Sequence, residues 1–516
     1  GSLKLTKLVK VNGAETTSKD ADGDYTFTVT KKDDPTTTRT VVVTVANGAA
    51  ASATIDGEAA ELDVDKYVTV SDLPTGEYVV SETGSSNTGM VLTSENDVEL
   101  EVKKDGTAAV PGASFTNSKP GAPEFDKKIA DANDSKADEQ PVSTLGDFVA
   151  ADWVDSADYD VKDPVPYKLT ATLPDDVTDY KQYVIKFTDQ MEAGRLALDE
   201  IVGYRVYKGA SAAAEGADYT YDTDAVKGAD RFEATFTFGD GSAKIANADL
   251  NGATVDLYFT ATLLPTATRG KPGNINGAML TYSNSPSSDS MGKKPWEYVI
   301  AFTYDLDISK VTKDPETGEN VALEGAQFAL KKFNAGTGAY EGVALANTAN
   351  IFAATGIDDG RYVLTETAVP DGYQPIDPIY FTVTAEHSPT WDHGLVIGDG
   401  PETSVLDASR VTILSSLTGL EVRGDNDDAV TGEVTFARSA DLDKLTGTVT
   451  NDKLKEPEFE KKIADVNDSE GTLPDDITEI TSDATEDPRW QDSADYDIND
   501  HVPYRLDAAL PDDISS

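Results

Sequence analysis

Short stretches in which apolar and polar residues alternate recur along the whole chain, and they constrain its fold more than any other feature. They are rich in threonine, valine, tyrosine and phenylalanine, as in 25–30, 39–45, 255–260 and 380–384. Alternation with a period of two is typical of strands that bury one face. No segment has a long helical period with caps. The sequence therefore predicts an all-β chain of sandwich or related Greek-key domains.

Length and an internal repeat set the predicted domains. A chain of 516 residues is too long for a single core. The segment 124–131 returns with one substitution at 458–465, and 155–160 returns unchanged at 492–497. The end of the chain therefore corresponds to the front portion of a second copy of the second domain. The predicted domains are 1–119, 120–304, 305–455 and a truncated 456–516.

Composition excludes several classes of protein. The net charge of −50 and the pI of about 4.2 exclude a general nucleic-acid binder, because no basic surface would offset the repulsion from phosphate. The chain has no cysteine, so neither disulfides nor thiolate metal sites hold it together. No apolar run reaches the length of a membrane span. We expect no nucleic-acid partner and no membrane span in this chain.

A lysine, an acid and an asparagine occur in the same order in each of the first three predicted domains. The lysine lies in an opening strand, the acid in a middle strand and the asparagine in a late strand. The triples are Lys7, Glu82 and Asn117, then Lys127, Asp189 and Asn284, then Lys310, Glu366 and Asn451. Any one of these residues, taken alone, is better interpreted as a surface charge on a strand. The repeated order favours a shared chemical role.

Strand periodicity places these lysines on apolar faces. Lys7 shares a face with Leu5 and Val9, whereas its neighbours in the sequence point the other way. The same periodicity selects Lys127 and Lys310. A lysine on the apolar face of a strand is unusual enough to require an explanation.

Burial of such a triple supplies a specific chemistry. Desolvation lowers the pKa of a lysine and raises that of a carboxyl group, so both become neutral. A neutral amine is a nucleophile, and a neutral acid polarises the asparagine carbonyl by donating a hydrogen bond. Folding holds the groups in contact, which speeds attack and the release of ammonia. We therefore expect intramolecular Lys–Asn isopeptide bonds, formed once by each site, and no enzyme with turnover.

The third predicted domain resembles the SpaA-type (collagen-adhesin B-type, prealbumin-like) domains of Gram-positive pilins and adhesins. The resemblance rests on 308–311, on 323–330 and on the glutamate-centred box 360–373. It implies an isopeptide bond between Lys310 and Asn451, promoted by Glu366. It also implies that the domains are tandem Ig-like or prealbumin-like β-sandwiches.

The other two domains resemble related modules of the same proteins. The first is similar to the streptococcal-pilin type in 25–29, 73–82 and 114–117, which implies a Lys7–Asn117 bond with Glu82 as the acid. The second is similar to the A-type isopeptide domain of backbone pilins. That likeness lies in 125–129, 165–174 and 278–284, and it implies a Lys127–Asn284 bond with Asp189 as the acid.

These features together predict a rigid stalk or adhesin segment of a secreted protein anchored in the Gram-positive cell wall. A pilus backbone subunit is an alternative, although no recognisable motif bears a polymerising lysine. A module that binds a glycan or a host protein is an alternative of another class. We expect a surface ligand, protein or glycan, as a possible partner, and attachment to peptidoglycan through a C-terminal sorting signal that this chain lacks.

Two further expectations concern the last segment and metals. Lys461 repeats the position of Lys127, but its asparagine would lie beyond Ser516, so we expect it to be unbonded and its segment to be poorly stable. The acidic stretch 131–135 lacks the full ligand spacing of a calcium loop. His387 has no glutamate at metal-binding spacing. We therefore predict no cofactor and no metal.

Overall fold

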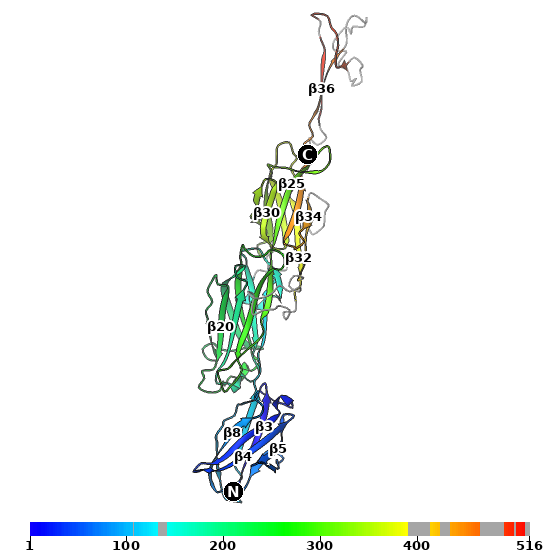
Figure 1. Cartoon of the computed structure of the whole chain (residues 1–516). Coiled ribbons are helices and arrows are strands. Elements are labelled where there is room, and N and C mark those ends of the chain that lie inside the picture. The colour runs from blue at the N-terminus through cyan, green and yellow to red at the C-terminus, as the bar shows by residue number, and fades with distance from the viewer. Residues whose placement is uncertain are drawn as a thin grey trace.

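The computed structural model describes residues 1–106, 108–132, 142–390, 413–423, 434–464, 490–499 and 502–510. In those ranges the chain is nearly all strand, as predicted. Helix is confined there to α1 (Leu145–Ala150) and to the 3-10 turns η1 (Lys19–Ala21), η2 (Val177–Asp179) and η3 (Ala248–Leu250). Figure 1 shows sandwich domains arranged end to end, with the segment around β36 (Glu458–Ala464) extending beyond them.

The first domain is a sandwich of two sheets. Its strands are β1 (Leu3–Val11), β2 (Ala14–Glu15), β3 (Gly23–Lys31), β4 (Asp34–Ala46), β5 (Ala49–Ile55), β6 (Glu58–Ala60), β7 (Tyr67–Val70), β8 (Gly76–Ser85), β9 (Val91–Leu92), β10 (Val98–Val102) and β11 (Gly112–Lys119). One sheet has the order β2-β1-β11-β9, with β7 also paired to β1, and the other has the order β10-β8-β3-β4-β5-β6. Alternation forms the core, because Tyr25, Phe27 and Val29 of β3 are buried and the threonines between them are not.

The second domain is also a sandwich and is larger. Its strands are β12 (Glu124–Ala130), β13 (Trp153–Val154), β14 (Ser156–Asp158), β15 (Pro164–Thr172), β16 (Tyr183–Met191), β17 (Leu196–Lys208), β18 (Ser211–Ala212), β19 (Tyr219–Thr223), β20 (Arg231–Phe238), β21 (Thr254–Leu263), β22 (Asn274–Ser283), β23 (Met291–Lys293) and β24 (Glu297–Phe302). The sheets have the orders β13-β12-β15-β21-β17-β18 and β14-β24-β22-β16-β20-β19, with β23 paired to β22.

The third domain repeats the architecture of the first. Its strands are β25 (Tyr304–Lys313), β26 (Asn320–Ala322), β27 (Gln327–Asn334), β28 (Ala339–Val343), β29 (Ala346–Thr348), β30 (Ile351–Ile357), β31 (Gly360–Ala368), β32 (Ile379–His387), β33 (Leu414–Val422), β34 (Val434–Arg438) and β35 (Lys444–Thr450). The sheets have the orders β29-β30-β25-β35-β34, with β26 on β25, and β28-β27-β31-β32-β33. Since β25 begins at Tyr304, the predicted boundary at 304/305 falls one residue inside this strand.

The last segment forms a single small sheet in the described residues. β36, β37 (Trp490–Gln491) and β38 (Tyr504–Ala509) have the order β37-β36-β38. β36 pairs with β38 as β12 pairs with β15 in the second domain. Its apolar side chains are largely exposed, with Phe459 67% and Leu506 64% accessible. In the described residues, the sheet therefore has the pairing of the repeat and leaves most of its apolar side chains exposed.

The first and last strands of the first and third domains lie side by side and run parallel. β1 pairs with β11 over Lys4–Val11, and β25 pairs with β35 over Asp305–Val311. Each domain is therefore entered and left through neighbouring strands of one sheet. This arrangement brings together residues that are far apart in the sequence.

The two joints between the sandwiches differ in character. The first is polar: Asn12 Oδ1 accepts a hydrogen bond from the Asp175 N–H at 2.8 Å, and Asp176 Oδ2 accepts one from the Gly121 N–H at 2.8 Å. The second joint is apolar and continuous with the core of the third domain. Ile300 and Phe302 lie on β24, a strand of the second domain, yet they belong to the apolar cluster of the third domain. The second and third domains are therefore the more firmly docked pair.

Candidate cross-link sites

The lysine of the first domain lies in the core, in contact with both predicted partners. Lys7 is 2% exposed. Its Nζ donates a hydrogen bond to Glu82 Oε2 at 2.7 Å and another to Asn117 Oδ1. Asn117 Nδ2 donates to Glu82 Oε1 at 2.7 Å. Amine, acid and amide thus form a closed triangle.

Strand register explains this meeting. Lys7 is directly opposite Phe115 in the parallel pair of β1 and β11, so Asn117 lies two residues further along on the same face. Side chains two residues apart point the same way. Glu82 reaches the pair from β8, a strand of the facing sheet.

The third domain repeats this geometry. Lys310 is opposite Val449, so Asn451 again lies two residues further along the parallel strand. Lys310 Nζ donates to Asn451 Oδ1 and lies 3.5 Å from Glu366 Oε1. Asn451 Nδ2 lies 3.1 Å from both carboxyl oxygens of Glu366. The Lys310 and Asn451 residues are fully buried, and the Glu366 side chain is 1% exposed.

A break in the strand ladder directly follows the acid in both domains. In the first domain Phe27 is opposite Glu82 and Thr26 is opposite Gly84, so Thr83 is an extra residue. In the third domain Phe328 is opposite Glu366, and the register shifts immediately beyond it. Such irregularities re-aim side chains and are frequent beside functional sites. The acid is therefore the last core-facing residue of the regular ladder.

Aromatic rings surround each lysine amine. Lys7 Nζ lies 4.6 Å from the ring centre of Tyr25, and Lys310 Nζ lies 5.3 Å from that of Phe328. Lys127 Nζ lies 5.0 Å from the ring centre of Tyr167. These rings exclude water from the amine, and removal of water favours its neutral form.

The second domain brings its lysine and its acid together across the two sheets. Lys127 of β12 and Asp189 of β16 are fully buried, and Lys127 Nζ donates a hydrogen bond to Asp189 Oδ2. Burial raises the pKa of Asp189 and lowers that of Lys127, in each case against the attraction of the partner. In the first domain, burial lowers the pKa of Lys7 to about 8. These shifts favour the neutral amine and acid that amide formation requires.

The structure contradicts the prediction that Asn284 is the partner of Lys127. Asn284 is exposed, lies just beyond the end of β22, and accepts a hydrogen bond from the Ser290 hydroxyl. The side chain that lies beside Asp189 is Asn276, which is fully buried in the same strand. Asn284 lies eight positions after Asn276, which along an extended strand is a span of roughly 27 Å.

Asn276 is positioned by the pairing of β16 with β22. Asp189 is opposite Ala278, so Asn276 is its diagonal neighbour on the buried face. Burial raises the pKa of Asp189 and that of Tyr167, and the nearby Asn276 side chain opposes the rise in both. Asn276, rather than Asn284, is therefore the candidate for the third member of the second triad.

Asn276 is absent from the predicted triples, because the rule behind them places the asparagine at the end of the closing strand. That rule holds for Asn117 and Asn451, whose strands lie beside the lysine strand. In the second domain the partner strand belongs to the opposite sheet, so the residue facing Lys127 is set by how the sheets cross. Strand periodicity could have raised Asn276 as a candidate, since it shares a face with Ala278 and Leu280 of β22.

Lys461 occupies the place of Lys127 in the last sheet. It is exposed, and its Nζ lies 4.5 Å from the ring centre of Tyr504, the repeat counterpart of Tyr167. Lys461 is opposite Leu506 as Lys127 is opposite Leu169. The lysine and its aromatic neighbour are thus present, and the acid and asparagine of the second triad have no counterpart among the described residues of this segment.

Comparisons with known proteins agree with the predicted domain type. Residues 306–393 match the SpaA family, a prealbumin-like fold domain, which confirms the resemblance of the third domain. No curated protein matches the chain.

Several solved structures of pilin subunits are similar to the chain. The major pilin BcpA of Bacillus cereus is 18% identical, with a TM-score of 0.39 over 88% of this chain and 99% of that one. The T6 backbone pilin of Streptococcus pyogenes is 16% identical, with a TM-score of 0.38 over 88% and 98%. The major pilin SpaD of Corynebacterium diphtheriae is 16% identical, with a TM-score of 0.35 over the same shares. Identities and TM-scores this low decide nothing about what this chain does.

Within the part of the chain that the structure describes, no helix combines the length and the apolar character needed to cross a bilayer.

Proposed function

We propose that this chain is a load-bearing stalk segment of a Gram-positive cell-surface protein, whose domains are locked by Lys–Asn isopeptide bonds. The proposed bonds are Lys7–Asn117, Lys127–Asn276 and Lys310–Asn451, with Glu82, Asp189 and Glu366 as the acids. The observation that carries the proposal is the identical register of lysine, asparagine and acid in the first and third domains.

The chemistry of each site balances without a cofactor. The lysine Nζ attacks the asparagine Cγ, and the bond from Cγ to Nδ2 breaks. One proton passes from Nζ to Nδ2 through the acid, and ammonia leaves. Contact in the folded core supplies the proximity that makes the step fast, and each site reacts once, so the protein is not an enzyme with turnover.

The position of each bond suits the transmission of force. Tension entering β1 would pass through Lys7 to Asn117 and leave at the next domain, which bypasses residues 8–116. In the third domain the bypass spans 311–450. A covalent path through neighbouring strands carries load that hydrogen-bonded sheets alone would not hold.

Single-molecule stretching of the full chain tests the proposal. The intact chain should show no unfolding step for the first domain. The variant E82Q, which cannot shuttle the proton, should add a step that releases residues 8–116, roughly 360–390 Å of extended chain. An unfolding step of that length in the unaltered chain would contradict a load-bearing role for the bond.

The alternatives predict other results. The similar solved structures are described as pilin subunits, and a backbone role would appear as a ladder of covalent polymers in cell-wall extracts. A ligand-binding module would instead bind a glycan or host protein saturably, with or without the bonds.

A further inference from the structure

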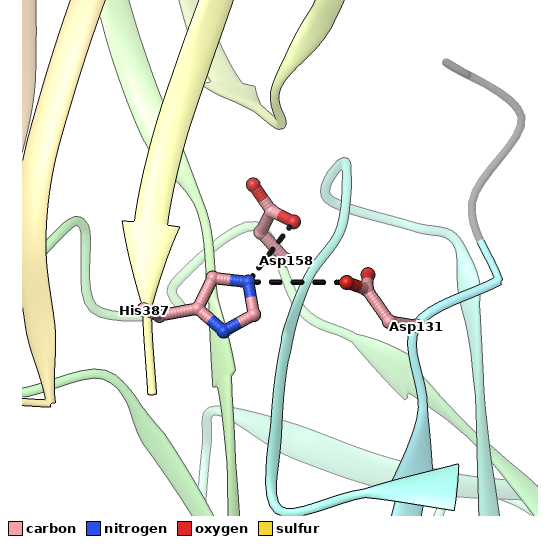
Figure 2. Close-up of side chains that lie close together, drawn as sticks. All are labelled: Asp131, Asp158 and His387. Carbon is pink, nitrogen blue, oxygen red and sulfur yellow. Dashed lines mark ion pairs between the residues drawn. The ribbon is translucent and has the colours of Figure 1, made fainter. Parts of the chain in front are cut away.

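Three polar side chains meet where the second domain docks on the third. Asp131 follows β12, Asp158 ends β14, and His387 ends β32 of the third domain (Figure 2). His387 Nε2 lies 3.6 Å from Asp158 Oδ1 and 4.0 Å from Asp131 Oδ2. One ligand atom of each residue lies within 4.8 Å of the other two. Both domains thus contribute to a compact set of one imidazole and two carboxylates.

A serine fixes the orientation of the histidine ring. Ser156 Oγ lies 2.8 Å from His387 Nδ1 and donates its hydrogen to the carbonyl oxygen of Ser388. A hydroxyl has one hydrogen to donate, so Ser156 must accept from the Nδ1–H of His387. Nδ1 therefore carries a proton, and Nε2 faces the two carboxylates (Figure 2).

This arrangement requires a proton or a metal cation between Nε2 and the two carboxyl groups. A neutral ring with its proton on Nδ1 would direct the Nε2 lone pair at two carboxylates, and the contact would be repulsive. Either a second proton or a metal cation must lie between them. An Nδ1–H held by an outer hydrogen bond, with Nε2 directed at the metal, is the usual arrangement of metal-binding histidines.

The surrounding charge favours a cation of more than one charge. Lys332 pairs with Asp160 at 2.8 Å and with Asp358. The Asp359 N–H also donates to Asp158 Oδ2 at 3.3 Å. Burial raises the pKa of Asp358 well above its usual value, which favours its neutral form. The other four carboxyl groups at this interface, those of Asp131, Asp158, Asp160 and Asp359, exceed the charge of one lysine and one imidazolium and would leave it negative.

We propose that Asp131, Asp158 and His387 bind a divalent transition-metal cation such as Zn²⁺, which clamps the second domain to the third. Zn²⁺ accepts imidazole nitrogen and carboxylate oxygen at about 2.0–2.2 Å, with water able to complete four ligands. The three donors need to close by a small movement, and Asp131, at the partly exposed edge of the joint, has room to make it. Calcium, which takes six to eight oxygen ligands, fits this set less well.

The proposed ligands come from two domains and from segments distant in sequence, so no local motif predicts a metal site: Asp131 follows β12, Asp158 ends β14 and His387 ends β32. Of the acidic stretch 131–135, only Asp131 and Ala132 lie in the described residues. This site is independent of the cross-link proposal, because it shares no residue with the triads.

Zn²⁺ binding by the full chain tests the site, by equilibrium dialysis with elemental analysis of the protein. The variants H387Q and D131N should each lose one tightly bound equivalent, with at least a tenfold weaker dissociation constant for it. The variant D126N, which removes a half-exposed carboxylate outside the cluster, should keep it. Co²⁺ should give a visible absorption band that H387Q lacks.

If the unaltered chain, H387Q, D131N and D126N all bound Zn²⁺ with the same stoichiometry and affinity, the binding would be adventitious, to the acidic surface only. That result would overturn the proposal. The site would then hold a proton on Nε2. D131N alters a partly exposed side chain, so it remains informative should H387Q fail to fold.

Discussion

At the scale of single residues, the buried lysines explain most of what is unusual in this chain. Lys7, Lys127 and Lys310 lie in apolar cores, where an isolated ammonium ion is costly. Each contacts a carboxyl group, and a buried ion pair alone is weak evidence for stability. Conversion of the amine to a neutral amide removes the charge of the lysine for good, so the proposed bond relieves the cost of burying it.

Replacing the acid of the third domain should prevent its bond. In E366Q the lysine and asparagine should remain unlinked, and the domain should lose about 5 kcal/mol of unfolding free energy, because a link across 141 residues restricts the unfolded chain. Denaturant unfolding measures the loss, with intact mass as the check. E324Q, at an exposed position, should behave as the unaltered chain; the same loss in both variants would argue against a role for Glu366.

The second domain offers a direct choice between two asparagines. N276A should retain one ammonia that the unaltered chain loses, whereas N284A should lose the same number as the unaltered chain. Intact mass of each variant, compared with its calculated mass, decides this. The reverse pattern would restore Asn284 as the partner of Lys127.

At the scale of elements, the pairing register of the strands determines which side chains meet at each site. This dependence on pairing also limits what can be predicted from the sequence. Periodicity identified the strands and the faces of the lysines, and the stretches 25–30 and 255–260 lie in β3 and β21 as expected. The order of residues was enough for Asn117 and Asn451, because first and last strands pair in one sheet. The position of Asn276 and the proposed metal site depend on how sheets and domains pack, and no local pattern encodes that packing.

The joint between the first two domains should depend on pH through Asp176. Burial raises the pKa of Asp176 to about 6, although its carboxylate accepts the Gly121 N–H. A raised folded-state pKa contributes stability that is present below the unfolded pKa of about 4 and is lost as pH rises through 6. The loss should be roughly 2–3 kcal/mol.

D176N should remove this part of the pH dependence, because the amide stays neutral throughout. Thermal unfolding of the second domain at pH 4.5 and pH 7 measures it, with D175N, at the neighbouring and more exposed position, as the control. Identical pH dependence in D176N and the unaltered chain would show that Asp176 does not titrate in this range.

At the scale of the whole molecule, the chain is a string of sandwiches joined without long linkers (Figure 1). The first joint is polar, and the second is packed and, by our proposal, clamped by a metal. β36 to β38 differ from the other strands, because their apolar side chains face solvent. Resistance to force and protease should therefore be high up to the end of the third domain and low after it.

Limited proteolysis should remove the last segment first. Backbone with few buried contacts opens most readily to proteases, so brief digestion should leave a stable fragment that ends between 451 and 464. Mass analysis of the limit fragment locates the cut. A first cut between β1 and β24 would contradict the proposed locking of the first two domains.

The intact mass of the purified chain at high resolution tests the central claim most directly, with peptide mapping of the linked pairs. The account predicts a deficit of three ammonias and the pairs Lys7–Asn117, Lys127–Asn276 and Lys310–Asn451, with Lys461 unlinked. A mass equal to that of the unmodified sequence would contradict it and leave three buried lysines held only by hydrogen bonds.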